Sequence, residues 1–218
     1  MINEDLEKVG GVIFDMDGTL IDSMWLWMEI DVEFLGRYGI PYVEGLQQMI
    51  EGKSFKETAI FFRDEFKIPE TIEYMMDEWN RMAYDKYNNE VFLKEGVYDF
   101  LLKLKKNNIP IGIATSNSRI LVKTVLERLN VIDFFDAIVT ADEVENGKPA
   151  PDVYLAGAKA IGVTPENCLV FEDILKGVMA GKAAGMKVCA VYDEYAAFTE
   201  EMKELADYYI NSFTELLP

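Results

Sequence analysis

Two carboxylates stand directly after the first apolar run of the chain. The segment Val12–Asp22 reads V-I-F-D-M-D-G-T-L-I-D, so the run ends in Asp15 and Asp17 follows two residues later. A short continuous apolar run predicts a buried parallel strand, and ligands of open α/β sheets bind beyond the carboxyl ends of such strands. Two acids placed there repel each other unless a cation or a shared proton offsets their charge. The alternative is an ordinary acidic turn, because Asp-Gly is common turn chemistry.

A cluster of small polar residues, Thr115-Ser116-Asn117, closes the second apolar run. A hydroxyl at that point, together with the free N–H groups of the following helix, suits a phosphate oxygen. The alternative is a plain helix N-cap, for which serine and asparagine are preferred residues. Taken alone, the cluster favours the N-cap.

A lysine and a second acid pair complete the set. Lys148 lies in N-G-K-P-A-P-D, where two prolines limit where the cation can go; a solvated loop lysine is the alternative. Glu172-Asp173 ends the fourth strand-like run and precedes a helix, which fits either hard-metal ligands or an acidic helix cap. Because all four clusters fall at one predicted sheet edge, they jointly predict a phosphoryl-transfer site. It would contain a nucleophile, an acid/base, phosphate donors and oxygen ligands for Mg²⁺.

The composition excludes several classes of function. The 218 residues contain no histidine, which rules out Ser-His and Cys-His triads, histidine-ligated zinc and histidine acid–base catalysis. A formal net charge of −18 argues against nucleic acid or an anionic membrane as a partner, and no apolar stretch approaches the ~18 residues of a membrane helix. The acidic N-terminus lacks the order of a signal peptide, so we expect a cytoplasmic protein. Cys168 and Cys189 lie in apolar runs and are expected to be buried free thiols.

Strand-like and helical patterns alternate over most of the chain. We expect strands at Gly11–Asp15, Ile109–Ser116, Ala137–Asp142, Cys168–Asp173, Lys187–Asp193 and, more weakly, Tyr208–Asn211. Between the later ones we expect helices at Val97–Asn107, Arg119–Leu129, Asp152–Ile161 and Ile174–Ala184. This alternation predicts the α/β class, with a doubly wound parallel sheet and right-handed crossovers.

The region between residues 23 and 91 has no convincing strand. Helical patterns cover Met24–Tyr38, Val43–Ile50, Phe55–Phe66 and Glu70–Tyr87. Its large apolar side chains are interpreted as the core of a helical bundle rather than as ligand contacts: Trp25, Trp27, Met28, Phe34, Phe61, Phe62, Met75, Met76 and Trp79. We therefore expect a helical domain of residues 23–91 inserted into an α/β catalytic core of residues 1–22 and 92–218.

The four polar motifs resemble those of the haloacid dehalogenase superfamily. The matching segments are Asp15-Met16-Asp17-Gly18-Thr19, Thr115-Ser116-Asn117, Gly147-Lys148-Pro149-Ala150-Pro151-Asp152 and Glu172-Asp173. Their order and the position of the helical insert are similar to the phosphatase and β-phosphoglucomutase-like branch, in which a helical cap follows the first motif. The likeness covers essentially the whole chain and implies a Rossmann-like core with a cap.

The resemblance implies roles for the residues that match the family's motifs. Asp15 would attack phosphorus and become the aspartyl-phosphate. Asp17 would protonate the leaving group and then activate water.

The second and third motifs would bind the phosphoryl group. Ser116 matches the family's hydroxyl residue, with Thr115 and Asn117 beside it, and Lys148 matches its lysine.

The resemblance also implies a Mg²⁺ site. Its ligands would be Asp15, the backbone carbonyl of Asp17 and Asp173, with Glu172 binding directly or through water. Mg²⁺ and Lys148 would favour the ionised form of Asp15 and lower its pKa.

Departures from the family pattern narrow the function. The mutases of this branch use a histidine after the first motif and an arginine in the cap, whereas this chain has no histidine and no arginine between Arg37 and Arg63. Asp17 argues against the dehalogenases and the phosphonate hydrolases, which lack that acid. The expected function is a Mg²⁺-dependent phosphatase acting on a small phosphorylated metabolite, such as a sugar phosphate. The first alternative is a sugar-phosphate mutase. The second is a catalytically silent binding protein, which is less favoured because Asp15, Asp17 and Lys148 are all intact.

Two cap residues are candidates for substrate contact. Lys53 and Ser54 lie in E-G-K-S, a break between two predicted cap helices. The alternative is that Ser54 caps the next helix and Lys53 is solvated. The expected assembly is a monomer or a small homo-oligomer.

Overall fold

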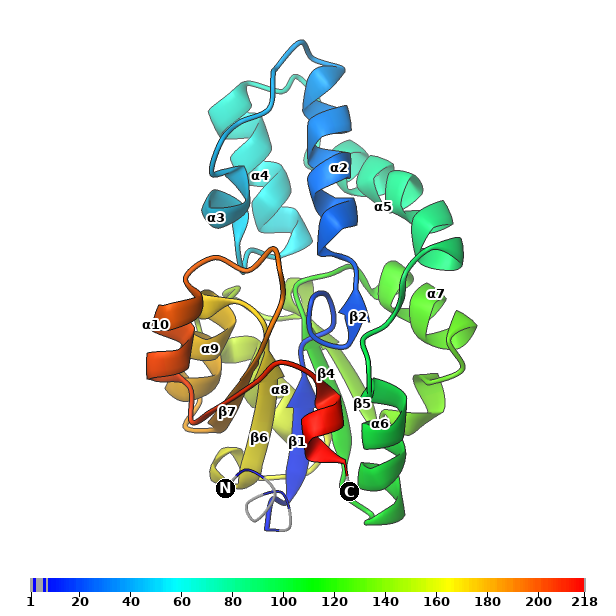
Figure 1. Cartoon of the computed structure of the whole chain (residues 1–218). Coiled ribbons are helices and arrows are strands. Elements are labelled where there is room, and N and C mark those ends of the chain that lie inside the picture. Colours follow the sequence, from blue (N-terminus) through cyan, green and yellow to red (C-terminus); the bar gives the residue numbers. More distant parts are fainter. Residues whose placement is uncertain (1, 3–5, 7, 218) are drawn as a thin grey trace.

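A parallel sheet with helices on both faces forms the lower part of the molecule in Figure 1. The computed structural model describes residue 2, residue 6 and residues 8–217, so most of the acidic N-terminal segment lies outside the described residues. The six strands run in the order β5-β4-β1-β6-β7-β8 and all pair in parallel. Their bounds fall within two residues of the predicted runs: β1 (Gly11–Phe14), β4 (Ile111–Thr115), β5 (Ala137–Thr140), β6 (Cys168–Glu172), β7 (Lys187–Val191) and β8 (Tyr208–Ile210). The predicted fold class is therefore confirmed.

The central strand β1 supplies side chains to both faces of the sheet. Val12 and Phe14 point to one face, where Phe14 stacks on Phe171 of β6 with ring centroids 5.0 Å apart. Ile13 points to the other face and packs in a separate buried cluster. This alternation follows from the two-residue period of a strand, and it makes β1 apolar throughout because both faces are covered.

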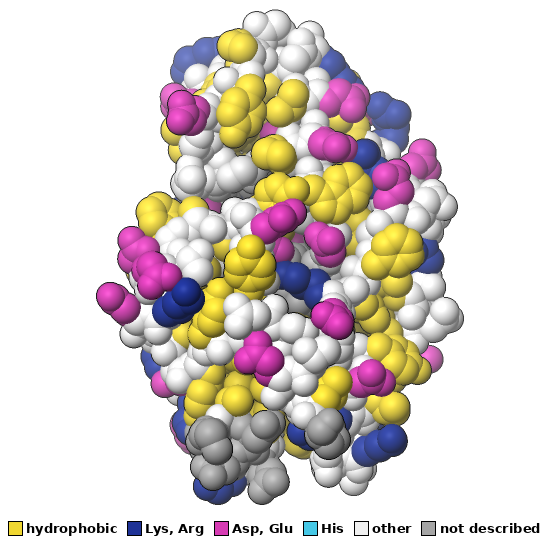
Figure 2. Space-filling view, in the orientation of Figure 1, with side chains coloured by type: hydrophobic (Ala, Val, Ile, Leu, Met, Phe, Trp, Pro, Cys, Tyr) yellow, Lys and Arg dark blue, Asp and Glu magenta, His cyan; other side chains and the backbone are white. Residues whose placement is uncertain are grey.

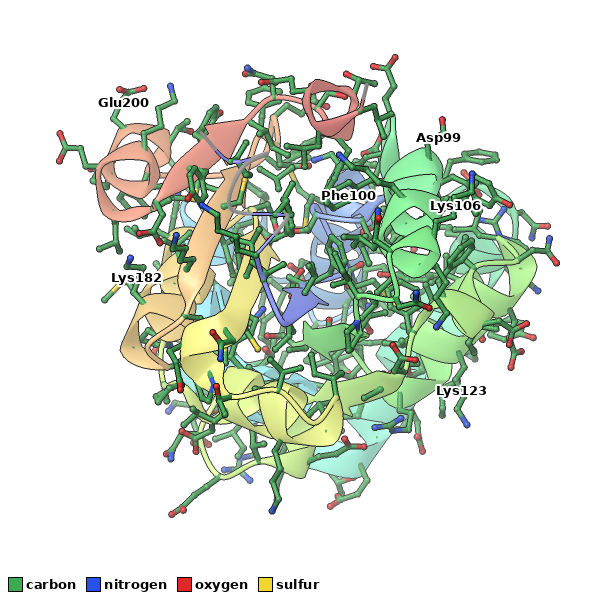
Figure 3. All side chains as sticks on the ribbon, turned by 90° about the horizontal axis from the view of Figure 1, so that it is seen from below. Asp99, Phe100, Lys106, Lys123, Lys182 and Glu200 are labelled. Atoms are coloured by element: carbon green, nitrogen blue, oxygen red, sulfur yellow. The ribbon has the colours of Figure 1, made fainter. Side chains whose placement is uncertain are left out.

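Helices cover each face of the sheet. One face carries α6 (Val97–Lys106) and α7 (Arg119–Arg128), and the other carries α8 (Asp152–Ala160), α9 (Leu175–Ala183) and α10 (Thr199–Leu205). Figure 3 shows Phe100 on the side of α6 that faces the sheet, whereas Lys123 points outward from α7. Short 3-10 helices complete the core: η1 (Ile132–Phe134), η2 (Ala141–Glu143), η3 (Pro165–Asn167) and η4 (Phe213–Leu216). The sequence did not predict α10, in which Met202 is the buried residue.

Four helices form the upper part of the molecule in Figure 1. They are α2 (Met24–Gly36), α3 (Leu46–Ile50), α4 (Phe55–Phe66) and α5 (Ile72–Asn89). All four were predicted, but α3 starts three residues later than expected because Gly45 precedes it in the left-handed conformation, at φ 77°. A left-handed residue cannot be part of an α-helix, so the helix begins after it.

An antiparallel strand pair joins the helical part to the sheet. It consists of β2 (Ile21–Asp22) and β3 (Phe92–Leu93), with Ile21 opposite Leu93. Strands of two residues show no periodicity, which is why the sequence did not predict this pair.

Aromatic rings form the interior of the helical part. The ring of Trp79 lies 5.5 Å from that of Phe34 and 5.2 Å from that of Phe62, both in edge-to-face contact. Such contacts stabilise a core beyond the burial of apolar area. The expectation of an aromatic bundle core holds for these residues.

Two further expectations concern the whole chain. Cys168 and Cys189 are free and buried, as predicted. Within the described residues, no helix has the length and apolar character needed to cross a membrane.

Candidate active site

The strand order brings the predicted motifs to one edge of the sheet. Because β1 lies between β4 and β6, Asp15, Thr115 and Glu172 all stand at the carboxyl ends of neighbouring strands. The backbone N–H of Asp15 still continues the sheet, donating to the carbonyl of Phe171 at 3.0 Å. The side chains beyond this edge face a pocket, as expected for an open α/β sheet.

Lys148 binds two buried carboxylates at this edge. Its Nζ donates to Oδ1 of Asp15 and to Oε1 of Glu172, both at 2.5 Å. Burial lowers the pKa of Lys148, but the charges of Asp15 and Glu172 outweigh that effect and raise the pKa above its ordinary value. Lys148 is therefore a fixed cation beside Asp15, as predicted, and not a solvated loop lysine.

The pKa of Asp15 is raised to about 8. Burial is the largest cause, Lys148 lowers the pKa, and the charge of Glu172 raises it again. The sequence led us to expect a lowered pKa from the combined charges of Mg²⁺ and Lys148. Lys148 alone does not offset burial, because it shares its charge with Glu172.

Both oxygens of Glu172 are engaged. Oε1 accepts from Lys148 and, at 2.8 Å, from the hydroxyl of Tyr154, while Oε2 accepts from the backbone N–H groups of Asp173 and Ile174 at 2.8 and 3.0 Å. A Cβ added at Gly177 would lie 1.8 Å from Oε1, so a glycine is needed there. This arrangement makes Glu172 the anchor of Lys148 and disfavours a direct bond from Glu172 to a metal.

Asp173 has one oxygen held by the protein and one left open. Oδ1 accepts from the hydroxyl of Thr19 at 2.8 Å, whereas the buried Oδ2 has no hydrogen-bond partner among the described residues. Burial, followed by the charges of Glu172 and Asp15, raises the pKa of Asp173 well above its ordinary value. A buried carboxylate oxygen without a partner is costly, and a bound cation would remove that cost.

The first loop lies directly against the open oxygen of Asp173. Gly18 has φ 78°, and a Cβ added there would be 2.1 Å from Oδ2 of Asp173. Only glycine combines this backbone conformation with such a close approach. The chain therefore brings the Asp15–Asp17 loop and Asp173 together.

The oxygen-rich donor set fits a hard divalent cation. Asp15, Asp173 and the backbone carbonyl of Asp17 supply only oxygen, which Mg²⁺ and Ca²⁺ prefer over nitrogen or sulfur ligands. Over residues 2, 6 and 8–217, no group of three or more His, Cys, Asp or Glu side chains could enclose an ion alone. The remaining positions would be filled by the carbonyl, water and substrate, as is usual for Mg²⁺.

The carboxylate of Asp17 is held by side chains from the helical part. Its Oδ1 accepts from the hydroxyl of Ser23 at 2.6 Å, from the indole N–H of Trp27 at 3.3 Å and from the hydroxyl of Tyr87. Its Oδ2 accepts from the amide of Asn117 at 2.8 Å. Burial, then the charge of Asp17, raises the pKa of Tyr87 well above its ordinary value, so Tyr87 is a neutral donor.

Sequence reasoning missed these contacts. Trp27 packs against the core, as expected, but it also lines the pocket and donates to Asp17, which the sequence did not predict. Tyr87 and Trp27 also bind each other through an N–H···O hydrogen bond of 3.1 Å. An amphipathic helix shows the same apolar period whether a side chain packs in the core or ends at a site, so the pattern carries no signal for this role.

Adjacent residues at and after the end of β4 have different roles. Ser118 caps α7 by accepting from the N–H of Leu121, so it takes the N-cap role. Thr115, Ser116 and Asn117 line the pocket instead. The structure thus places the predicted phosphate-binding residues in the same pocket as Asp15 and Asp17, and Asn117 donates directly to Asp17.

A loop of the helical part rests on the Lys148 segment. Gly52 has φ 74°, and a Cβ added there would lie 2.9 Å from the carbonyl oxygen of Lys148. The hydroxyl of Ser116 donates to the carbonyl of the same Gly52 at 3.4 Å. Lys53 lines the pocket, whereas Ser54 caps α4 in a capping box with Glu57. The geometry therefore favours the capping role for Ser54 and keeps Lys53 as the cap candidate.

Acidic side chains are spread over both parts of the face shown in Figure 2, with basic side chains between them. This distribution agrees with the net charge of −18. Lys53 of the cap loop lines the pocket, with its Nζ 5.9 Å from the centre of the Phe61 ring, and Lys148 binds the pocket residue Asp15.

Comparison with known proteins decides the family. A family model described as haloacid dehalogenase-like hydrolase matches residues 12–191. The chain belongs to this family. The haloacid dehalogenase-like match spans every motif of the pocket edge, from Asp15 to Asp173, so the predicted family is confirmed.

Similar proteins are phosphatases and a mutase. The chain is 33% identical over 176 residues to a phosphorylated carbohydrates phosphatase of Thermotoga maritima, covering 81% of this chain and 82% of that protein. It is 32% identical over 192 residues to a fructose-1-phosphate phosphatase of Escherichia coli, covering 83% and 95%. A crystal structure of β-phosphoglucomutase from Clostridium difficile superposes with a TM-score of 0.82 at 25% identity, covering 95% and 93%. The predicted enzyme class, a hydrolase of phosphoric monoesters, agrees with these relatives.

Proposed function

We propose that this protein is a Mg²⁺-dependent phosphatase that hydrolyses a small phosphorylated metabolite through an aspartyl-phosphate on Asp15. The observation that carries the proposal is the arrangement at the end of β1. There Asp15 faces the pocket, accepts a hydrogen bond from the buried Lys148 and interacts through its charge with Asp173, whose Oδ2 has no hydrogen-bond partner among the described residues. A nucleophilic carboxylate, a fixed cation and a cation-binding carboxylate are the parts that phosphoryl transfer requires.

The proposed chemistry has two displacements. In the first, an oxygen of Asp15 attacks phosphorus, the bond from phosphorus to the ester oxygen breaks, and Asp17 gives a proton to the departing oxygen. In the second, Asp17 takes a proton from water, the water oxygen attacks the phosphorus of the aspartyl-phosphate, and the carboxylate of Asp15 is released with inorganic phosphate. Asp17 thus acts first as an acid and then as a base.

Positive charge at the phosphoryl group comes from two sources in this proposal. Lys148 and the hydroxyls of Thr115 and Ser116 bind the phosphoryl oxygens. Asp15, Asp173 and the carbonyl of Asp17 would hold Mg²⁺, which would neutralise the charge that develops on those oxygens. Glu172 keeps Lys148 in place and would contact the metal only through water.

The helical part, residues 23–91, acts as the cap in this proposal. Its contacts support that role, because Trp27 and Tyr87 bind Asp17 and the loop at Gly52 lies on Lys148. A cap that covers the pocket would restrict water and provide contacts to the leaving group.

A screen of phosphorylated metabolites tests the proposal. Purified protein is incubated with each compound and Mg²⁺, and released phosphate is measured. We expect turnover of at least one sugar or polyol phosphate and of p-nitrophenyl phosphate. Asp15→Asn should abolish turnover of both, because an amide neither attacks phosphorus nor binds the metal as an anion. Retention of more than a small fraction of activity in Asp15→Asn, or full activity in excess EDTA, would reject the mechanism.

A sugar-phosphate mutase is the second candidate, favoured by the superposition on β-phosphoglucomutase. Incubation with β-glucose 1-phosphate separates the two candidates. A phosphatase releases free phosphate, whereas a mutase forms glucose 6-phosphate.

A further inference from the structure

A buried carboxylate on the cap side of the pocket has no role in the chemistry proposed above. Asp31 lies on α2, is 6% exposed and lines the same pocket as Asp15 and Asp17. The amide of Gln47 on α3 donates to its Oδ2 at 2.7 Å. The structure gives Asp31 no ion pair with a described lysine or arginine, although buried carboxylates are usually paired with a cation.

The position of Asp31 fits contact with the part of a substrate remote from phosphorus. Trp27 and Asp31 are four residues apart on α2, so they lie on the same face of the helix, about 6 Å apart along its axis. Trp27 donates to Asp17, the residue that would protonate the leaving group. Asp31 therefore lies one helical turn further into the cap than the point where the leaving group begins.

The polar residues of the cap that line the pocket favour a hydroxyl group as the ligand of Asp31. Gln47 contacts Asp31, Gln48 and Thr58 line the same pocket, and all three can both donate and accept hydrogen bonds. Trp79 also lines the pocket, and its buried indole N–H has no hydrogen-bond partner among the described residues. A hydroxyl can donate to a carboxylate and accept from an N–H, whereas an ammonium group can only donate.

We propose that Asp31, oriented by Gln47, is the specificity-determining residue of the cap and accepts a hydrogen bond from a hydroxyl group of the leaving group. The preferred substrates are then polyol or sugar phosphates rather than alkyl phosphates of the same length. This inference rests on the proposed phosphatase function. Burying a carboxylate without a paired cation is costly to a fold. Asp31, which has no ion pair with a described lysine or arginine, is therefore expected to serve ligand binding rather than folding.

Matched substrates test the proposal. The panel contains two matched sets. The four-carbon set is erythritol 4-phosphate, n-butyl phosphate and 4-aminobutyl phosphate, and the six-carbon set is the phosphates of sorbitol, hexanol and aminohexanol. A further substrate is p-nitrophenyl phosphate. The variants are Asp31→Leu and Asp31→Asn, with Asp77→Asn as control because Asp77 is an exposed cap carboxylate on α5. Wild-type protein should prefer the polyol phosphates in kcat/KM. Asp31→Leu should lower kcat/KM for them roughly 10- to 100-fold, the loss typical of a hydrogen bond to a charged group, and leave alkyl phosphates unchanged.

Asp31→Asn separates the possible ligands. An amide oxygen still accepts from a hydroxyl, so this variant should retain more polyol activity than Asp31→Leu, and the melting temperature of both variants should rise at pH 8. Preference for the aminoalkyl phosphates, with equal losses in both variants, would replace the hydroxyl by an ammonium group and overturn the proposal. Equal losses on all substrates together with lower melting temperatures would show a structural role. Hydrolysis of p-nitrophenyl phosphate without a preference for polyol phosphates would overturn the proposed role of Asp31 but leave the phosphatase function standing. If no compound is hydrolysed, both the role of Asp31 and the phosphatase function are rejected.

Discussion

The hydrogen bond from Tyr87 to Asp17 should support protonation of the leaving group, and Tyr87→Phe removes that bond with little change in shape. Tyr87 is fully buried, and its hydroxyl also accepts from Trp27 and Asn117 at 3.1 and 2.8 Å. Both of those donors keep a bond to Asp17 in the variant, because each is already shared between Tyr87 and Asp17. The variant should therefore fold, with a loss of about 1 kcal/mol in the free energy of unfolding.

The effect on rate follows from the number of donors that remain. A hydrogen bond to a charged group contributes about 1.5–3 kcal/mol, but Ser23 and Trp27 continue to hold the same oxygen of Asp17. About half of that range, roughly 1 kcal/mol, should be lost from transition-state stabilisation, which corresponds to about a 5-fold lower kcat/KM. The loss applies to alkyl phosphates, whose leaving oxygen needs a proton, and much less to p-nitrophenyl phosphate, whose leaving group departs as a stable anion.

The assay is the dependence of kcat/KM on the pKa of the leaving group, measured with a series of aryl and alkyl phosphates. Tyr87→Phe should make this dependence steeper. The control is Tyr84→Phe, because Tyr84 lies on the same helix and is 44% exposed. An equal loss for every leaving group would refute the reasoning, since it would show that Tyr87 shapes the pocket rather than positions Asp17.

Three other changes have defined outcomes. Gly18→Ala should raise the Mg²⁺ concentration needed for half-maximal activity, because the new Cβ would meet Asp173. The control is Gly39→Ala, because Gly39 has a similar φ of 72° with open space around it. An effect common to both variants therefore reports backbone strain of about 1–3 kcal/mol. Burial raises the pKa of Asp31 to about 7, so the unfolded chain releases this proton at a lower pH than the folded protein does. The stability of wild-type protein relative to Asp31→Asn should therefore fall by at most about 4 kcal/mol between about pH 4 and pH 7, and stay constant above pH 7. A difference in melting temperature that does not change with pH would contradict this assignment. Lys53→Ala should lower kcat/KM for the true substrate much more than for p-nitrophenyl phosphate, since only the former uses cap contacts; equal losses would remove Lys53 from the site.

The edge of the sheet that carries the proposed site could be predicted from the sequence because its signal is local. Asp15 directly follows a run of apolar residues and the pair Glu172-Asp173 ends another, and acids at such points have no packing explanation. The parallel order of the strands then brings these ends together wherever the helices lie. The same signal could not tell that Glu172 binds Lys148 and Tyr154, because that distinction depends on contacts between distant segments.

The cap side of the site was only partly predictable. Trp27 and Tyr87 have the period of core residues, and only the packed structure shows that their polar atoms reach Asp17. Asp31 did leave a signal in the sequence, since it lies four residues after Trp27 and three before Phe34 and so places a charge on an apolar helix face. A single acid on an apolar stripe therefore marks a position worth testing as a ligand contact.

The pairing of β2 with β3 has a consequence for how this protein can change over time. Because Ile21 lies opposite Leu93, the chain leaves the core and returns to it at points about 5 Å apart. The segment between β2 and β3 is thus an insertion whose two ends lie close together. The entropy cost of closing such a loop rises only slowly with its length. Residues of this segment that do not contact Asp17 or Lys148 can be gained, lost or exchanged without altering the register of the six-stranded sheet. Substrate preference can therefore diverge while the arrangement of Asp15 and Lys148 stays the same.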